Sequence, residues 1–184
     1  YTYFFRGKVY ANAQTGNIVL LSQHLFAGDF LKALHYLIPL VAFASGILAA
    51  ELFREHFQSL KALHWRQMIV LAEILLLFSV GFFPQELNLL ANAVVSFSCA
   101  MQVQTFRKVS GYAYASTMCI GNMRGGMEAL AVWIVKHDPK ALRKVSHYFG
   151  IIFLFGVGAG LGWVAVEHFA TRAIWWSCPV SYTH

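Results

Sequence analysis

The 184-residue chain has little charge. Charged residues make up 12% of it and only eight are acidic, while hydrophobic residues reach 58%. A soluble domain carries about 25% charged residues. So few polar side chains cannot cover the surface of a soluble helical core. The composition therefore predicts an all-α fold, a multi-pass transmembrane helical bundle.

Residue patterns typical of enzymes and metalloproteins are also missing. The three cysteines (Cys99, Cys119 and Cys178) have no paired spacing, so packing is their expected role. The eight histidines form no His-x-x-x-His or Cys/His cluster, and no phosphate loop, nucleophile elbow or paired carboxylate is present. We therefore expect no catalytic residue, no metal and no cofactor.

Charge is absent from blocks of almost membrane length. Residues 37–50, 87–106 and 148–166 carry none, and residues 68–83 carry only Glu73. A helix needs about 20 apolar residues to cross a bilayer. The pattern predicts membrane-spanning helices at 34–53, 67–83, 87–107 and 147–167. It also predicts helices at 15–32 and 119–136, for which crossing of the membrane stays open.

The net charge of +6 does not indicate nucleic-acid binding, because the basic residues lie at the ends of the apolar runs. That placement is typical of interfacial and cytoplasmic anchors in a cell membrane. The residues concerned are Arg6, Lys8, Arg54, Lys61, Arg66, Arg107, Lys108 and the basic residues of segment 136–144.

One short motif occurs twice. Residues 11–17 (ANAQTGN) are answered by residues 116–122 (STMCIGN), and the Lys-Ala-Leu triplet at 32–34 is answered at 140–142. The echo predicts two internal repeats, residues 1–86 with a truncated first helix and residues 87–184, which together form one membrane domain. Inverted and parallel repeats both fit, since the charge distribution satisfies the positive-inside rule either way.

The two Gly-Asn pairs are candidate substrate-binding elements at discontinuous helix starts. A helix start offers unpaired N–H groups and positive potential, and two such starts related by a repeat can form a polar site. Thr15 is placed to cap the first start. The alternative is close helix packing at the glycines with cross-helix hydrogen bonds from the asparagines. Both interpretations stay open for Gln14, Thr15, Gly16, Asn17, Gly121 and Asn122.

A polar line follows one face of the helix expected at 87–107. Asn92 and Gln102 are its candidate substrate-binding members, along with Asn88, Ser96 and Cys99. The line equally fits ordinary hydrogen bonding between helices.

Two ionisable residues add to the candidate site. Glu73 lies in the middle of a predicted span, where a charge costs at least ~2.5 kcal/mol, so it is a candidate for proton coupling. Arg124 is a candidate for binding an anionic group if its segment lies within the bilayer. It also stands four residues before Glu128, at the spacing of an ion pair on a solvated helix face.

Several of these stretches resemble the YoaK-like family of bacterial multi-pass membrane proteins. The similar stretches are residues 9–21 (VYANAQTGNIVLL), Phe43-x-x-Gly46, Met101-Gln102 and residues 121–124 (GNMR). The resemblance implies a bacterial inner-membrane protein without a known cofactor, from a family with no settled biochemical function. Ile120 stands where that family often has a second threonine, which puts a hydroxyl function of the second motif in doubt. The first helix of the family lies outside this sequence.

Taken together, the sequence predicts a transporter or channel for a small polar or anionic solute, embedded in the lipid bilayer. The first alternative is a non-transporting subunit that binds another membrane protein, or a second copy of the chain, through the glycine-rich fourth span. The second alternative is a membrane enzyme or redox protein that uses the histidines.

Overall fold

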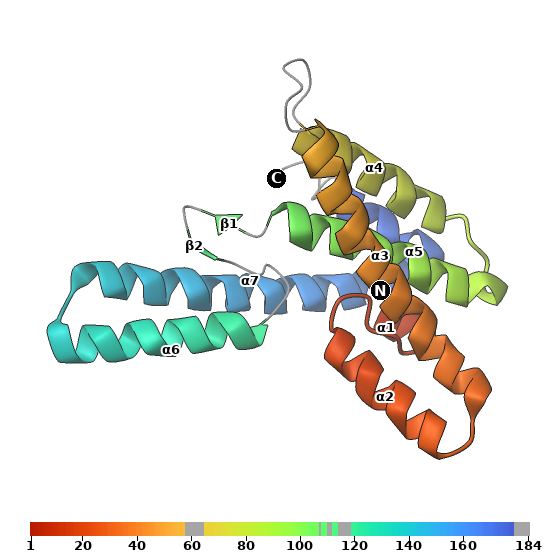
Figure 1. The fold of residues 1–184 in the computed structure, drawn as a ribbon, viewed down its shortest axis with the longest axis horizontal. Coiled ribbons are helices and arrows are strands. Elements are labelled where there is room, and N and C mark those ends of the chain that lie inside the picture. The colour runs from red at the N-terminus through yellow and green to blue at the C-terminus, as the bar shows by residue number, and fades with distance from the viewer. Residues whose placement is uncertain (58–64, 107, 110–111, 114–118, 179–184) are drawn as a thin grey trace. The chain divides into compact units, whose positions relative to one another are not determined.

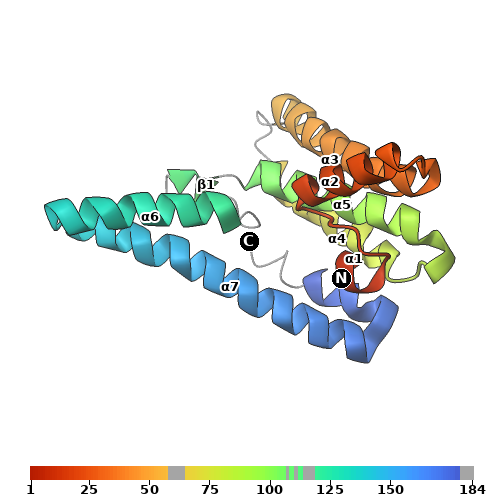
Figure 2. The same ribbon diagram turned by 90° about the horizontal axis from the view of Figure 1, so that it is seen from below.

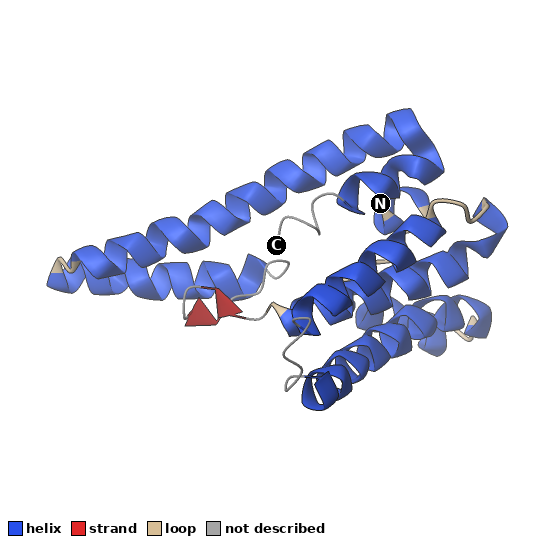
Figure 3. Ribbon diagram, turned by 90° about the horizontal axis from the view of Figure 1, so that it is seen from above, coloured by secondary structure: helices blue, strands red, loops and turns tan. Residues whose placement is uncertain are grey.

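The computed structural model describes residues 1–57, 65–106, 108–109, 112–113 and 119–178, and these are almost entirely helical (Figures 1 and 3). The elements in chain order are α1 Thr2–Phe5, α2 Gln14–Phe26, α3 Phe30–Phe57, α4 Trp65–Val80, η1 Gln85–Leu87, α5 Asn88–Thr105, β1 Lys108–Val109, β2 Tyr112–Ala113, α6 Cys119–Lys136, α7 Pro139–Phe169 and η2 Ala170–Trp176. The predicted all-α class is confirmed. The only strands among the described residues are the two-residue pair β1 and β2.

All six predicted helices are present, but the one nearest the N-terminus is shorter than expected. The helix expected at 15–32 stops at Phe26, and a turn leads into α3. Gly28 makes this turn with a positive φ of 75°, a conformation that glycine adopts without strain. The Asp29 carboxylate accepts a hydrogen bond from the Lys32 backbone N–H. It also forms an ion pair with the Lys32 ammonium group at 2.9 Å. The Lys32 side chain and then its backbone N–H lower the pKa of Asp29.

The chain forms two compact units, residues 1–105 with 162–184 and residues 106–161. In the first unit, α3 packs on α5 and α2 packs on α3. Gly46 makes the α3–α5 contact close, since a Cβ there would lie 2.5 Å from the Phe97 carbonyl oxygen. The contacts advance together along both helices, from Gly46 with Phe97 to Ala50 with Met101. The helices α3 and α5 are therefore parallel.

The helix α4 runs antiparallel to α5. Ile69, near the start of α4, clusters with Met101 near the end of α5. Leu77, near the end of α4, clusters with Val95 and Ala91 further back in α5. The buried side chains of α4 recur every three or four residues, so one face of this helix is turned toward α5.

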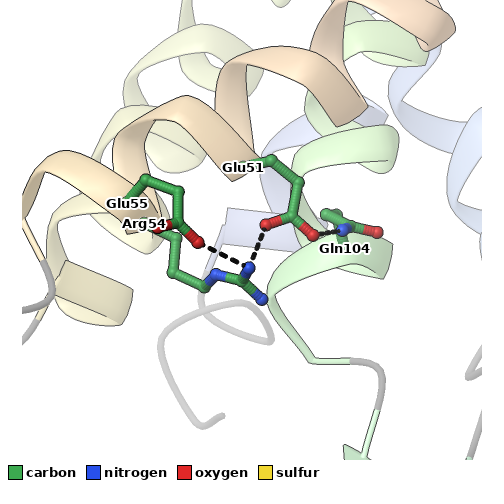
Figure 4. Close-up of polar contacts among 4 residues, drawn as sticks. All are labelled: Glu51, Arg54, Glu55 and Gln104. Atoms are coloured by element: carbon green, nitrogen blue, oxygen red, sulfur yellow. Dashed lines mark hydrogen bonds and ion pairs between the residues drawn. The ribbon is translucent and has the colours of Figure 1, made fainter.

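A polar cluster joins the C-terminal ends of α3 and α5 (Figure 4). Glu51 accepts a hydrogen bond from the Gln104 side chain and pairs with Arg54 at 2.8 Å. Arg54 also pairs with Glu55 at 2.9 Å. The cluster therefore links α3 to α5 by polar contacts near the ends of the two helices.

The second unit is a hairpin of α6 and the first part of α7 (Figure 2). A turn at His137 and Asp138 reverses the chain, and His137 takes a positive φ of 50°. Gly125 lies against the Tyr148 ring, and Gly126 lies against Phe149. Small residues on α6 therefore let it approach two aromatic side chains of α7.

Four membrane spans were expected, but only two described helices are long and apolar enough to cross a membrane. These are Phe30–Phe57 and Pro139–Trp176, the latter including η2. The 16 residues of α4 extend only about 24 Å at 1.5 Å per residue, less than the ~30 Å hydrocarbon core. The 18 residues of α5 extend about 27 Å, close to that thickness, but its amides and hydroxyls lower its hydropathy. The predicted repeats at 1–86 and 87–184 remain a prediction.

The close contact at Gly46 gives a first test. Gly46→Ala is expected to lower the stability by about 1–3 kcal/mol, because the new methyl overlaps a backbone oxygen. Gly150→Ala is the matched control, since a Cβ at Gly150 has no described neighbour within 4 Å and alanine favours helix by about 1 kcal/mol. Thermal unfolding in detergent measures both variants. Equal shifts in Tm would show that α3 and α5 are not packed in this way.

Candidate functional site

The first Gly-Asn motif begins α2, and its asparagine is fully buried. The Asn17 side chain accepts a hydrogen bond from the Tyr10 N–H at 3.1 Å and donates one to the Tyr10 carbonyl at 2.6 Å. It also donates to Gln14 Oε1 at 2.8 Å, and Gln14 in turn donates to the Ala11 carbonyl. Asn17 therefore holds the preceding segment of its own chain against α2.

Gly16 and Thr15 have different surroundings. A Cβ at Gly16 would lie 3.0 Å from the Tyr10 ring, so the glycine lets this ring cover the helix start. Thr15 is exposed and lies inside α2, while Ala13 occupies the N-cap position without a side-chain hydrogen bond. The expected cap by Thr15 is wrong, because the helix begins at Gln14.

The second motif begins α6, and its residues 116–118 lie outside the described part of the chain. Asn122 is buried like Asn17, while Gly121 is exposed. Arg124 lies on the exposed side of α6 and pairs with Glu128 at 2.8 Å. This placement matches the solvated ion pair, one of the two interpretations of Arg124. The two motifs belong to different compact units, so a shared site remains a prediction.

A buried arginine organises the first unit. Arg6 is 0% exposed, although its position in the sequence predicted an interfacial anchor. Its guanidinium donates to the carbonyl oxygens of Phe83 at 2.7 Å and Pro84 at 2.9 Å, just beyond the end of α4. Further acceptors are Asn88 Oδ1, the Tyr1 hydroxyl and the Val80 carbonyl. Arg6 thus satisfies the carbonyls at a helix C-terminus, where the helix dipole favours a cation.

Polar side chains on α5 continue from Arg6 into the bundle. Asn92 is fully buried and donates to the Arg6 carbonyl at 2.7 Å. Ser96 and Ser98 are fully buried too, and no described atom forms a hydrogen bond with either hydroxyl or with Asn92 Oδ1. Gln102, further along α5, is half-buried. Buried polar atoms without partners are rare in proteins and mark strain, function or bound water.

Glu73 lies on the face of α4 that is turned toward α5 and is 3% exposed. One turn before it Ile69 clusters with Met101, and one turn after it Leu77 clusters with Val95. The antiparallel register therefore places Glu73 level with Ser98. The structure thus buries the predicted residues Glu73 and Asn92 in the α4–α5 layer, together with two serines, but it does not bring the four side chains into one site. Asn92 lies nearly two turns before Ser98 on α5, and Ser96 points about 200° away from Ser98 around the helix. Of the two buried serines, only Ser96 was part of the polar line that the helical periodicity predicted.

Metal ligands do not gather in the described residues, where no group of three histidine, cysteine, aspartate or glutamate side chains could hold an ion. The layer offers one buried carboxyl group together with uncharged hydrogen-bonding groups. Such groups can bind a polar solute or water.

Arg6 was missed because no sequence signal reveals its burial. No acidic side chain of the described residues pairs with it, and its acceptors are mainly backbone carbonyls far away in the chain. Asn88, at the start of the polar line, was the one partner that the helical spacing pointed to.

Removal of the Arg6 guanidinium leaves several buried carbonyls without donors. Arg6→Met is therefore expected to cost at least ~3 kcal/mol, since each hydrogen bond from a charged group contributes about 1.5–3 kcal/mol. Arg124→Met, on the exposed face of α6, is expected to change the stability by less than ~0.5 kcal/mol. Thermal unfolding of both variants in detergent measures the two losses of stability. An Arg6→Met protein as stable as the wild type would show that the hydrogen bonds of Arg6 do not support the fold.

Asn17→Leu separates a structural role of the motif from a solute-binding role. Loss of the amide leaves the Tyr10 N–H and carbonyl unpaired, which is expected to cost about 1–3 kcal/mol. Gln23→Leu, on the exposed side of the same helix, is the control. An unchanged Tm for Asn17→Leu would rule out the structural role.

Comparison with known proteins gives a family but no characterised relative. No curated protein and no solved structure is significantly similar to the chain. The family described as "Protein of unknown function (DUF1275)" matches residues 1–182, almost the whole chain. Because this match covers nearly the whole sequence, the chain belongs to the DUF1275 family.

Proposed function

We propose that the protein is a multi-pass integral membrane protein of the bacterial inner membrane. Two helices have the length and composition of membrane spans. In the second, Pro139–Trp176, only 6% of the most apolar segment is buried. A core helix of a soluble protein would be mostly buried. Large apolar side chains are also exposed elsewhere, among them Phe26, Leu31 and Ile120, each more than 80% exposed. Lipid is the solvent that such a surface fits.

We further propose that the protein moves a small polar or anionic solute through the first unit, as a carrier or as a channel. The observation that carries this proposal is the burial of Glu73 inside a bundle with an apolar exterior. Ionisable residues inside membrane helices are costly and commonly mark ion and substrate pathways. Asn92, Ser96 and Ser98 supply uncharged hydrogen-bonding groups on the helix that Glu73 faces.

In this mechanism Glu73 carries a proton when the α4–α5 interface is closed. A carboxylate removed from water is costly unless it is paired, so a closed interface favours the neutral acid. Opening toward water lets the proton leave, and a solute can then form a hydrogen bond with Ser98, the serine level with Glu73. Proton release favours the open state and solute binding requires it, so the shift between the closed and the open state links the movement of the proton to that of the solute.

Charge supports an orientation for the first unit. The end of the bundle where α3 finishes and α4 begins carries Arg54 and Arg66, whereas the α4–α5 turn carries Glu86 and binds one arginine, Arg6. Cytoplasmic loops are enriched in lysine and arginine. We therefore place the α3–α4 connection in the cytoplasm.

The design of the two hairpins supports the proposed duplication. Each Gly-Asn motif opens a helix that a short turn joins to a longer one, as in α2–α3 and α6–α7. Asp29 and Asp138 each accept a hydrogen bond from a backbone N–H at the start of the longer helix. Ala33 and Ala141 of the matching triplets are both buried.

Proton-coupled flux tests the function. Liposomes containing the protein and the pH indicator pyranine are mixed with the small-molecule fraction of a bacterial cell extract. Wild-type protein is expected to acidify or alkalinise the interior faster than protein-free liposomes. Glu73→Gln should abolish the difference, and Glu55→Gln, an exposed glutamate of α3, should keep it. Wild-type liposomes that behave like protein-free ones would contradict the proposal.

The second candidate is a non-transporting subunit that binds another membrane protein or a second copy of the chain. A Cβ built on Gly156, Gly158, Gly160 or Gly162 of α7 meets no described atom within 4 Å. Such glycines let a neighbouring helix approach closely in a membrane. Constant co-purification with a different membrane protein, without any flux, would favour this candidate.

A further inference from the structure

A cleft opens beside the turn of the α6–α7 hairpin, entirely within the second unit. Its volume is about 420 Å³, and it is lined from α6 by Gly125, Glu128, Ala129 and Val132 and from the turn and α7 by Asp138, Lys140, Ala141, Lys144 and Tyr148. We propose that this cleft binds the phosphate of an anionic phospholipid headgroup. The proposal rests on the membrane location proposed above and is independent of transport.

Residue size and spacing build the cleft. Gly125, Ala129 and Ala141 have little or no side chain, which leaves space between the two helices. Lys140, Lys144 and Tyr148 are four residues apart, so they lie along one face of α7. The Tyr148 ring packs on Gly125, where a Cβ would lie 2.9 Å from the ring carbon that bears the hydroxyl. This contact fixes the ring at the inner end of the cleft.

The charge of the hairpin favours an anion. The cleft is lined by two acidic and two basic side chains, Glu128, Asp138, Lys140 and Lys144. Arg124 pairs with Glu128 at 2.8 Å, and Asp138 accepts a hydrogen bond from the Lys140 backbone N–H at 2.9 Å. With Arg124 included, three basic and two acidic side chains give the site a net charge of +1. Two ammonium groups and a hydroxyl on one helix face are donors suited to a phosphate.

The apolar surface beside the cleft favours a lipid over a free phosphate ion. Phe155 lies two helical turns beyond Tyr148 on the same face of α7 and is exposed, as are Phe153 and Leu154. Met127 is exposed on α6 near the cleft. A phospholipid held by its phosphate at the lysines can lay its acyl chains along these side chains. Basic pockets between membrane helices bind anionic headgroups in this way.

Lipid binding to the purified full chain tests the proposal. Native mass spectrometry in a neutral detergent counts retained phosphatidylglycerol, with phosphatidylcholine and inorganic phosphate as comparison probes. Wild-type protein is expected to retain phosphatidylglycerol in preference to phosphatidylcholine. The double variant Lys140→Gln/Lys144→Gln should weaken its retention about tenfold. The control Lys136→Gln/Arg143→Gln removes the same charge from side chains that do not line the cleft, and it should weaken retention less than about threefold.

Tyr148→Phe keeps the ring on Gly125 and removes only the hydroxyl, so it tests the site in a protein with unchanged packing. It should lower phosphatidylglycerol retention about threefold, the loss of one hydrogen bond. Equal losses in the two double variants would overturn the proposal, because a diffuse basic surface would then explain the binding. Equal binding of inorganic phosphate would overturn the lipid assignment.

Discussion

The distribution of polarity, with apolar side chains on the outer faces and several polar side chains within an apolar interior, is the constraint on which the rest of the structure depends. Arg6, Asn17, Glu73 and Asn92 are at most 3% exposed, while large aliphatic and aromatic side chains cover the outer faces of the helices. In water this arrangement would cost free energy on both counts. In hydrocarbon the apolar side chains contact lipid, and polar groups such as Arg6 and Asn17 bond to the backbone within the bundle.

Helix ends show how the fold meets that constraint. Carbonyl groups beyond the end of α4 have no partner within their own helix, and in a membrane they cannot rely on water. Arg6 supplies them with donors from a segment that precedes α2 in the chain. Asn17 does the same for the backbone of Tyr10 at the start of α2. The two side chains thus fix the N-terminal segment against the bundle, and the remaining buried polar groups of α5 and Glu73 form the layer that we assign to function.

The existence of the helices could be predicted from the sequence, because runs such as 148–166 have only one stable state in an apolar environment. The candidate site could be predicted in part. Glu73 and Asn92 stood out as polar residues in apolar runs, and both are buried in the α4–α5 layer. The burial of Arg6 and the role of Asn17 could not be predicted, since both depend on contacts with backbone atoms. Nor does periodicity reveal that α4 is too short to span alone, because its ends are set by the turns around it.

The most direct test of this account is the environment of an exposed apolar position on α7. A spin label is attached at Phe153→Cys in a protein whose three native cysteines have been replaced, and the protein is reconstituted in liposomes. The account predicts that oxygen, which concentrates in hydrocarbon, relaxes this label more than a water-soluble nickel complex does. A label at Lys136→Cys should show the reverse. Stronger relaxation of the Phe153 label by the nickel complex would place α7 in water and contradict the account.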